Sequence, residues 1–259
     1  MDRISISTII MVLVLIFLIG PFVVIFISSF GTQEFLSFPP QGFTLGWFKK
    51  VISMDMFKES MKLSVIIAIL ASIFASVLGI PSAYALSRYD FMGKRIVETF
   101  LTLPVIVPGM VAGLTLLRIF VMMNLFSIKT TLLIGHTIIV LPYSIRITRT
   151  ALENLPTDIE EAAISLGASK LKAFFLTVLP NIKTGIIASF ILMFIISFNN
   201  VPISLFLTGP GVNMLPIVMM SYMEYYYDPS IAALSTLLIL LTFGIVILSQ
   251  KLLGITRYM

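Results

Sequence analysis

The residues of this chain that could do chemistry are few, and their types exclude most catalytic sites. The sequence has one histidine, His136, and no cysteine. A zinc site, a Cys–His pair and a disulfide are excluded, because each needs at least two such residues. The sequence also has no HExxH motif, no GxSxG turn and no GxxxxGK[ST] loop to hold the phosphates of ATP. An enzyme is therefore not expected.

Three groups of polar residues remain, and their chemistry is recognition. Glu160 and Glu161 stand together in a charged stretch, and Asn199 and Asn200 lie in an apolar stretch just before Pro202. The third group consists of two acids within a run of tyrosines, namely Glu224 and Asp228 with Tyr222, Tyr225, Tyr226 and Tyr227. Carboxylates and amides at these positions can bind a solute, a partner protein or a helix end.

The elements that position these residues must cross a membrane. Of the 259 residues, 58% are hydrophobic and only 11% are charged, against roughly 25% charged in a soluble domain. The 17 bases exceed the 12 acids and give a net charge of +5. In a membrane protein such an excess marks cytoplasmic loops, so we do not expect a nucleic acid as a partner.

Hydrophobic stretches of about 20 residues can cross the bilayer as helices. The sequence predicts an all-α integral membrane protein, with residues 1–259 forming a single transmembrane domain. Asp228 and Pro229 supply the start signal of the last helix, as N-cap and first-turn proline. The six predicted spans are approximately 9–30, 63–86, 97–123, 131–150, 185–207 and 229–248.

The distribution of bases predicts the orientation. Most of them fall on the same side as the N-terminus, and the opposite side holds mainly the lysines of 49–62. The positive-inside rule then places both termini in the cytoplasm. On the outside, residues 45–57 predict an amphipathic helix at the membrane surface, with Trp47 at the headgroup level. Phe38, Pro39 and Pro40 predict a rigid turn before it.

A cytoplasmic loop of approximately 151–184 is the most informative segment. Pro156 breaks the preceding helix, and Thr157 with Glu160 three residues later predicts a capping box at the start of a short new helix. Gly167 predicts its end in the left-handed conformation. One face of this helix is predicted to carry Ile159, Ala162, Ala163 and Leu166.

The loop continues in a second predicted helix, which Leu179 and Pro180 end. A nine-residue helix is marginal in water by itself and needs a surface to pack on. Two interpretations are open. The short helix packs on this protein's own helix ends as a local cap, or it projects as a docking knob for a cytosolic partner.

The residues of this loop resemble the EAA motif of ABC-importer permeases. That motif has the form E-A-A, three residues, G, nine residues, I, one residue, L-P. Glu161-Ala162-Ala163, Gly167 and Leu179-Pro180 match it, while Thr177 stands where isoleucine is usual. The segments 81–88, 93–95 and 104–109 also resemble those permeases. We refer to residues 151–184 as the EAA loop.

The resemblance implies the fold of a type I ABC-importer permease with a cytoplasmic coupling helix, in the cytoplasmic (inner) membrane. It implies as partners a second, homologous permease in a heterodimer, two ATPase subunits and an extracytoplasmic solute-binding protein. ATP and magnesium would be bound by the ATPase, and no cofactor is expected in this chain. The residues expected to couple to the ATPase are Glu160, Glu161, Ala162, Ala163, Leu166, Gly167, Leu179 and Pro180.

Within that family the segments 197–202 and 205–210 resemble the second permease of spermidine/putrescine importers. Those importers carry acidic residues where this chain has Asn199 and Asn200. A carboxylate would be the natural partner of a polycation, and asparagine lacks that charge. Related importers carry phosphonates, sulfonates or ferric ion through the same architecture, and these are the alternative solutes. A secondary carrier is a less favoured rival, because Glu98 is the only acid within the predicted spans.

The predicted solute path involves polar residues at membrane depth and at the outer surface. Asn199 lies 14 residues beyond Gly185, or roughly 21 Å along a helix, and Pro202 should interrupt the helix there. Interhelical hydrogen bonding by the asparagines is the alternative. For the tyrosine cluster, an aromatic belt at the interface is the alternative. The candidate path residues are Asn199, Asn200, Pro202, Glu224 and Asp228.

Overall fold

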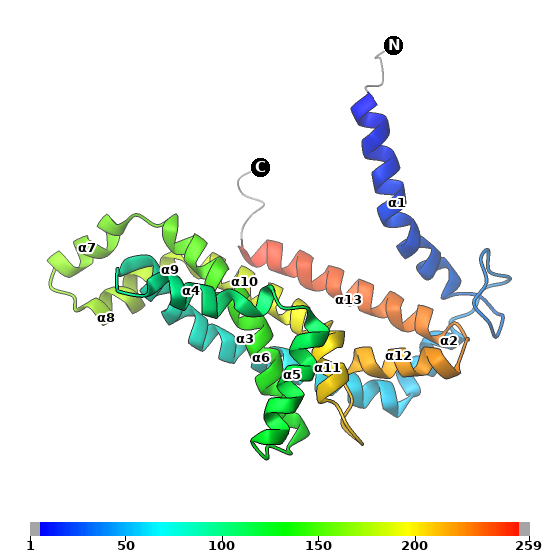
Figure 1. Cartoon of the computed structure of the whole chain (residues 1–259). Coiled ribbons are helices and arrows are strands. Elements are labelled where there is room, and N and C mark those ends of the chain that lie inside the picture. Colours follow the sequence, from blue (N-terminus) through cyan, green and yellow to red (C-terminus); the bar gives the residue numbers. More distant parts are fainter. Residues whose placement is uncertain (1–5, 254–259) are drawn as a thin grey trace, which may run out of the picture. The chain divides into compact units, whose positions relative to one another are not determined.

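The computed structural model describes residues 6–253, and over this range the chain is helical (Figure 1). One isolated bridge, between Gly209 and Val212, is the only β pairing in that part of the chain. In chain order the elements are α1 (Ile6–Ser28), α2 (Gly46–Ser53), α3 (Asp55–Arg88), α4 (Lys94–Thr102), η1 (Leu103–Val105), α5 (Gly109–Met122), α6 (Ile128–Glu153), α7 (Thr157–Ser165), α8 (Lys170–Ala173), η2 (Phe174–Val178), α9 (Leu179–Asn181), α10 (Lys183–Phe198), α11 (Val201–Leu207), α12 (Leu215–Tyr225) and α13 (Ser230–Leu253).

Two compact units make up the chain. The smaller unit combines Met1–Glu59 with Val218–Ile245, and the larger combines Ser60–Ile217 with Val246–Met259. The larger unit contains the EAA loop and most of the candidate site residues.

Four of the described helices are long and apolar enough to cross a membrane, namely α1, α3, α6 and α13. Two further pairs of helices qualify together but are sharply bent: Lys94–Val105 with Gly109–Met122, and Lys170–Asn181 with Lys183–Phe198. The number of spans reaches six if each bent pair counts as one. The prediction of an all-α membrane protein is confirmed, and the helices extend a few residues beyond most predicted ends.

The third predicted span, 97–123, is wrong as a continuous helix. Its two halves meet at an angle of 104°, with the break at 106–108. Pro108 precedes α5 with extended backbone (ψ 130°). A proline has no N–H to continue the helix and disfavours helical geometry in the residue before it, so Pro104 and Pro108 account for the bend.

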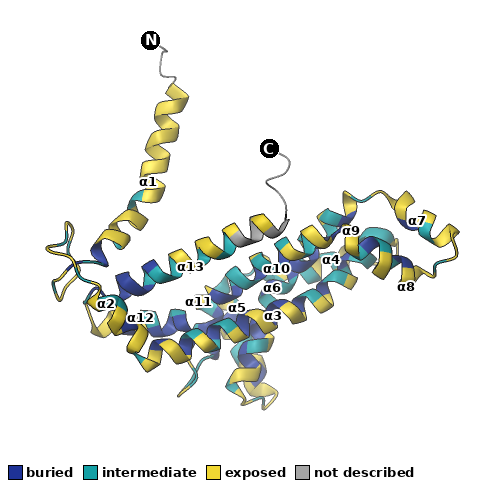
Figure 2. Cartoon of the chain, turned by 180° about the vertical axis from the view of Figure 1, so that it is seen from behind, coloured by how far each residue is buried: buried dark blue, intermediate teal, exposed yellow. Residues whose placement is uncertain are grey.

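In the smaller unit, the predicted surface helix is wrong as one continuous helix. Instead of one helix over 45–57, α2 ends at Ser53, Met54 is extended (ψ 116°), and α3 begins at Asp55. The Trp47 indole donates a 2.7 Å hydrogen bond to the carbonyl of Gly31, and the Phe38–Pro39 bond is cis. Nearly all of α1 is exposed in the isolated chain (Figure 2), as expected of a helix whose solvent is lipid or another subunit.

The core of the larger unit is built around α6, whose inner side is buried along its length (Figure 2). Small residues allow its neighbours to approach closely. A Cβ at Gly79 would lie 2.4 Å from the Ser144 hydroxyl, and one at Gly185 would lie 2.6 Å from Cβ of Ala151. Close backbone approach through small residues is the usual way in which helices pack in membranes.

Candidate functional site

The short helix α7 begins differently from the predicted capping box. Its N-cap is Pro156 (ψ 138°), which has no side chain that can accept a hydrogen bond, and Thr157 is the first helical residue. Glu160 does not fold back to the helix start, because its carboxylate has other partners. The capping box is therefore wrong. The acids Asp158 and Glu160 still lie in the first turn, where the helix dipole favours negative charge.

The end of α7 is as predicted. Gly167 has φ +93°, the left-handed region that glycine adopts without cost. Its N–H bonds the carbonyl of Ile164 at 2.9 Å, and the N–H of Ala168 bonds that of Ala163 at 3.1 Å. This pair of bonds is the Schellman motif, which satisfies the last carbonyls of the helix.

One face of α7 is uncovered. Ile159, Ala162 and Leu166 are exposed, and Leu166 retains 90% of its surface. Ala163 is half-buried, so it belongs only in part to the apolar face predicted from the sequence. α7 and α8 lie beyond the ends of α6 and α10, with α7 largely exposed (Figures 1 and 2). An exposed apolar face on so short a helix favours docking over a local cap.

The other face of α7 is anchored to the end of α3. Glu160 is 8% exposed. It accepts a hydrogen bond from the Tyr84 hydroxyl and pairs with Arg88, whose Nε lies 3.4 Å from Oε2 without hydrogen-bond geometry. Arg88 also donates from Nη2 to the carbonyl of Leu155 at 3.0 Å. Neither Tyr84 nor Arg88 was predicted to contact the loop, since nothing in their local spacing indicates this partner.

The second part of the loop is a helix of mixed type. Ser169 caps α8 by accepting a bond from the N–H of Lys172 at 3.3 Å. The segment η2 is π-helical, and α9 extends the helix past Leu179 and Pro180 to Asn181. The helix thus ends one residue later than predicted. Leu179 is half-buried and Pro180 is exposed, while the buried anchor is Val178.

The asparagine pair stands at a break between two helices. α10 ends at Phe198 and α11 begins at Val201, with Pro202 in its first turn, so the interruption lies just before the proline. Asn199 is exposed and donates to the carbonyl of Ile195 at 3.0 Å. Asn200 is half-buried, and its side chain caps α11 by accepting a 2.9 Å bond from the N–H of Ile203.

His136 connects α6 to both sides of this break. It is 1% exposed, and its Nδ1 lies 2.9 Å from the Ser197 hydroxyl on α10. Its Nε2 lies 3.3 Å from the Ser204 hydroxyl on α11. Ser204 in turn donates to the carbonyl of Asn200 at 2.5 Å. The histidine is thus a packed, hydrogen-bonded residue, and its two serine partners were not predicted.

In the smaller unit, Asp228 is neutralised by a lysine. Lys50 donates to Asp228 at 2.5 Å, Tyr222 donates to the same carboxylate at 3.0 Å, and the N–H of Ser230 donates to Oδ1 at 3.0 Å. Burial alone would raise the pKa of Asp228, but these donors outweigh it and the pKa lies below its ordinary value. Burial likewise opposes the charge of Lys50, yet the contact with Asp228 raises the pKa of the lysine.

The two outer acids therefore differ. Glu224 is exposed on α12, a helix that the sequence did not predict, whereas the Asp228 side chain is 13% exposed. The start of α13 lies one residue later than predicted, and Asp228 still accepts the first N–H. Tyr222 is buried and stacks on Tyr226, with ring centroids 4.6 Å apart. No group of three or more His, Asp or Glu side chains among the described residues could hold a metal ion.

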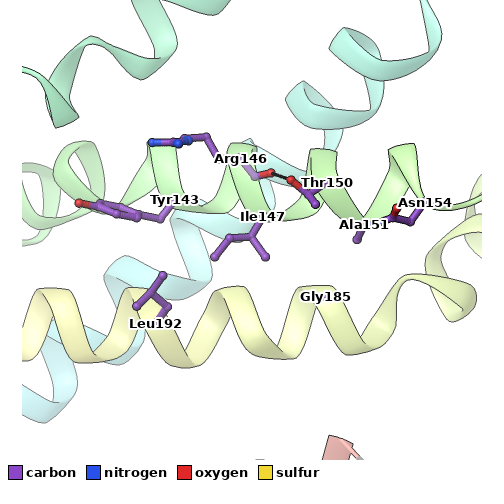
Figure 3. Close-up of a pocket in the computed structure, with 8 residues that line it drawn as sticks. All are labelled: Tyr143, Arg146, Ile147, Thr150, Ala151, Asn154, Gly185 and Leu192. Atoms are coloured by element: carbon purple, nitrogen blue, oxygen red, sulfur yellow. Dashed lines mark hydrogen bonds between the residues drawn. The ribbon is translucent and has the colours of Figure 1, made fainter. Parts of the chain in front are cut away.

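A groove of about 580 Å³ lies between α6 and α10. Figure 3 shows Ile147 and Leu192 pointing into the space between the two helices. The polar residues that line the groove all come from α6 and its end: Tyr143, Arg146, Thr150 and Asn154. Arg146 and Thr150 are exposed. Exposed polar side chains on a membrane helix face water or protein rather than lipid.

Comparison with known proteins agrees with this architecture. Residues 75–254 match the family described as "Binding-protein-dependent transport system inner membrane component". The chain belongs to this family. It is therefore a multi-pass membrane permease of an ABC importer and not a catalytic enzyme. As a permease component, it works with other importer subunits.

Individual relatives cover most of the chain. The spermidine/putrescine transport system permease protein PotC of Escherichia coli K12 is 30% identical over 230 residues, or 89% of this chain and 87% of the relative. The putrescine transport system permease protein PotI of the same organism is 32% identical, covering 86% of this chain and 82% of the relative.

Solved structures share the fold of this permease. A bacterial ABC transporter involved in the import of the acidic polysaccharide alginate matches with a TM-score of 0.63 at 18% identity, covering 97% of this chain and 99% of the other. The MetNI methionine ABC transporter in an inward-facing conformation matches with a TM-score of 0.65 at 17% identity, covering 77% and 95%. The expected fold of an ABC-importer permease is thus confirmed.

Proposed function

We propose that this permease belongs to an ATP-driven importer of polyamines of the spermidine/putrescine type. The relatives named PotC and PotI support the solute class. The bases of the sequence support an orientation with both termini in the cytoplasm. In this orientation the EAA loop faces the cytoplasm, and Glu224 and Asp228 lie on the outside.

The observation that carries the proposal is the uncovered apolar face of α7. Ile159, Ala162 and Leu166 form a narrow ridge on a helix that the Schellman motif at Gly167 closes. We propose that this ridge enters a cleft on an ATPase subunit. Glu161, Leu179 and Pro180 complete the docking surface, together with the half-buried Ala163 beside the ridge.

ATP and magnesium are bound by that ATPase, because this chain has no phosphate-binding loop. Two ATPase subunits, a second homologous permease and an extracytoplasmic binding protein complete the importer. The exposed polar residues Arg146 and Thr150, near the cytoplasmic end of α6, support a position of this face toward the second permease or the solute path, because such groups are stable beside protein or water.

The proposed solute path passes the break between α10 and α11. Asn199 is the exposed polar residue there, while Asn200 and Pro202 fix the geometry of the break. At the outer surface Glu224 offers a carboxylate to a polycation. Asp228 already has Lys50 as its counter-charge, so its contribution to attracting a cation is small.

Purification of the tagged chain from its native membrane in a mild detergent tests the proposal. We expect an ATPase, a second permease and a binding protein in the purified material. The Tm of the binding protein should rise when spermidine or putrescine is added. A chain that purifies stably without an ATPase would contradict the coupling role of α7 and favour a secondary carrier. A binding protein that takes only an anion would contradict the polyamine.

A further inference from the structure

We infer that the end of α3 is the element through which movement of α7 enters the membrane domain. In this arrangement Glu160 is a positioning residue, held by Tyr84 and Arg88, and it does not belong to the docking surface itself. The inference rests on the proposed function, in which α7 is the helix that docks on the ATPase.

The burial of Glu160 separates it from its acidic neighbours. Asp158 and Glu161 are exposed, whereas Glu160 is buried beside the last turn of α3. The side chains of Arg88 and Glu160 are 12% and 10% exposed. A carboxylate this buried is stable only with a counter-charge and hydrogen bonds. Breaking this contact would leave an unpaired charge, so the contact resists separation of α7 from α3.

The last turn of α3 holds the loop at three successive places. Before α7, Arg88 donates to the carbonyl of Leu155 at 3.0 Å. Within α7, both Tyr84 and Arg88 contact Glu160. After α7, the ring of Phe174 packs edge-on against that of Tyr84, with centroids 4.7 Å apart. α7 therefore cannot tilt or shift without moving the end of α3.

α3 connects this end to the opposite side of the larger unit. It stays helical through Pro81, and Ala68, Ala71 and Ala75 on its inner face are fully buried. Near its other end, the Ser64 hydroxyl accepts a 2.8 Å bond from the N–H of Leu215, the first residue of α12. Ser64 and Arg88 are roughly 36 Å apart along the helix at 1.5 Å per residue.

Both covalent routes from α7 into the membrane domain are less regular. Toward α6 the chain leaves the helix over 154–156, where Pro156 is extended (ψ 138°). Toward α10 it passes through the π-helical segment η2 and then a bend of 71° between Lys170–Asn181 and Lys183–Phe198. Such irregular segments absorb displacement. α3 is an unbroken helix that contacts the loop at three places. It therefore transmits a displacement of α7 further than the irregular covalent connections do, and we assign the transmitting role to α3.

The test uses the complete importer reconstituted in proteoliposomes, with ATP hydrolysis and spermidine uptake measured on the same sample. Glu160→Gln keeps the size of the side chain and removes its charge. We expect the ATPase to stay bound and to hydrolyse ATP, while uptake per ATP falls at least about tenfold, because the buried guanidinium of Arg88 is left without its counter-charge. Tyr84→Phe keeps the Arg88 pair but removes the hydrogen bond to the carboxylate, and we expect a fall of about tenfold, the factor for losing a hydrogen bond to a charged group.

Asp158→Asn is the matched control. It removes an exposed carboxylate from the same turn of α7, and uptake per ATP should stay at the level of the unmodified importer. The absence of native cysteines allows a second test. In Tyr84→Cys/Glu160→Cys, uptake should be uncoupled from hydrolysis until a short bifunctional thiol reagent bridges the two positions, and bridging should restore at least half of the uptake per ATP.

Normal uptake per ATP in Glu160→Gln, or a bridged double variant that stays uncoupled, would overturn the inference while leaving the proposed function intact. Loss of ATPase binding in Glu160→Gln would overturn it as well, because Glu160 would then be a docking residue. Failure of the proposed function has a different signature, since the unmodified chain would then bind no ATPase at all.

Discussion

The imidazole of His136 lies 2.9 Å from the hydroxyl of Ser197, and through its other nitrogen it lies 3.3 Å from that of Ser204. One side chain of α6 thereby fixes the two helices on either side of the α10–α11 break. His136→Leu would leave the buried Ser197 hydroxyl without its partner and would remove one of the two contacts of Ser204, which keeps its bond to the carbonyl of Asn200. We expect a loss of roughly 1–2 kcal/mol in stability, measured as a lower Tm in detergent, and reduced uptake.

Thr137→Val is the control for His136. The Thr137 hydroxyl donates only to the carbonyl of Leu133 in its own helix, so its removal should change Tm very little. Equal loss of Tm in the two variants would refute the bridging role of the histidine.

The two asparagines at the break should have different roles, with Asn200 stabilising the structure and Asn199 contacting the solute. Asn200→Ala removes the cap of α11 and should cost about 1 kcal/mol of stability, which Asn200→Ser should largely restore. Asn199→Ala removes a side chain that bonds only its own helix. Stability should stay within about 0.5 kcal/mol, while the KM for spermidine should rise. Unchanged uptake in the double alanine variant, fully assembled, would favour a packing role for both.

The left-handed conformation of Gly167 should matter for coupling. A Cβ at this position would meet nothing within 4 Å, so Gly167→Ala costs only backbone strain of roughly 1–2 kcal/mol. That strain acts on the end of α7. We expect less bound ATPase and lower uptake, while membrane insertion stays normal.

Gly211 offers a matched control, since it also has a positive φ, of +73°, and open space around its Cβ position. Gly211→Ala introduces the same kind of strain far along the chain from the EAA loop. It should leave ATPase binding unchanged, and a comparable loss in both variants would mean that general instability explains the effect.

The Lys50–Asp228 pair predicts a specific pH dependence. Because the pKa of Asp228 is lowered from 3.8 in the folded protein, its stabilisation is present above that value and is lost as the pH falls through the folded pKa. Because the pKa of Lys50 is raised from 10.5, its stabilisation is present below that value and is lost as the pH rises through the folded pKa. The Tm advantage over Asp228→Asn should thus be constant near neutral pH.

Comparison with Lys58→Met tests whether the contribution of the Lys50–Asp228 pair to Tm depends on the burial of Asp228. Lys58 and Asp55 form an exposed pair, and exposed pairs contribute little. Loss of the Lys58–Asp55 pair should leave Tm unchanged across the pH range. A Tm difference between the unmodified chain and Asp228→Asn that persists in strong acid would show that the charge of Asp228 is not the cause.

Local sequence signals predicted the parts of this structure that depend on local chemistry. Pro156 and Gly167 gave the start and end of α7, because a proline and a left-handed glycine restrict the backbone whatever surrounds them. The apolar stretches predicted the long helices, because a helix satisfies its own backbone hydrogen bonds within a bilayer. The bend at Pro108 was missed because an apolar stretch with proline fits either a kinked or a broken helix.

Contacts between distant segments could not be predicted. Glu160 has the spacing of a capping box with Thr157, but it binds Tyr84 and Arg88, which lie more than 70 residues earlier in the chain. The tertiary ion pair replaces the local hydrogen bond because a buried guanidinium also needs a partner. In the same way, a single histidine gives no indication that Ser197 and Ser204 will meet it.

In the proposed importer, the exposed ridge of α7 docks on an ATPase that drives polyamine uptake. The most direct test is ATP-dependent uptake of labelled spermidine by proteoliposomes that contain the importer with Leu166→Asp, which places a charge at the most exposed point of the ridge. Met92→Asp, at another fully exposed apolar residue, is the control. We expect Leu166→Asp to lose both ATPase binding and uptake, while Met92→Asp keeps both. Uptake by Leu166→Asp at the level of the unmodified importer would contradict the docking role of the ridge.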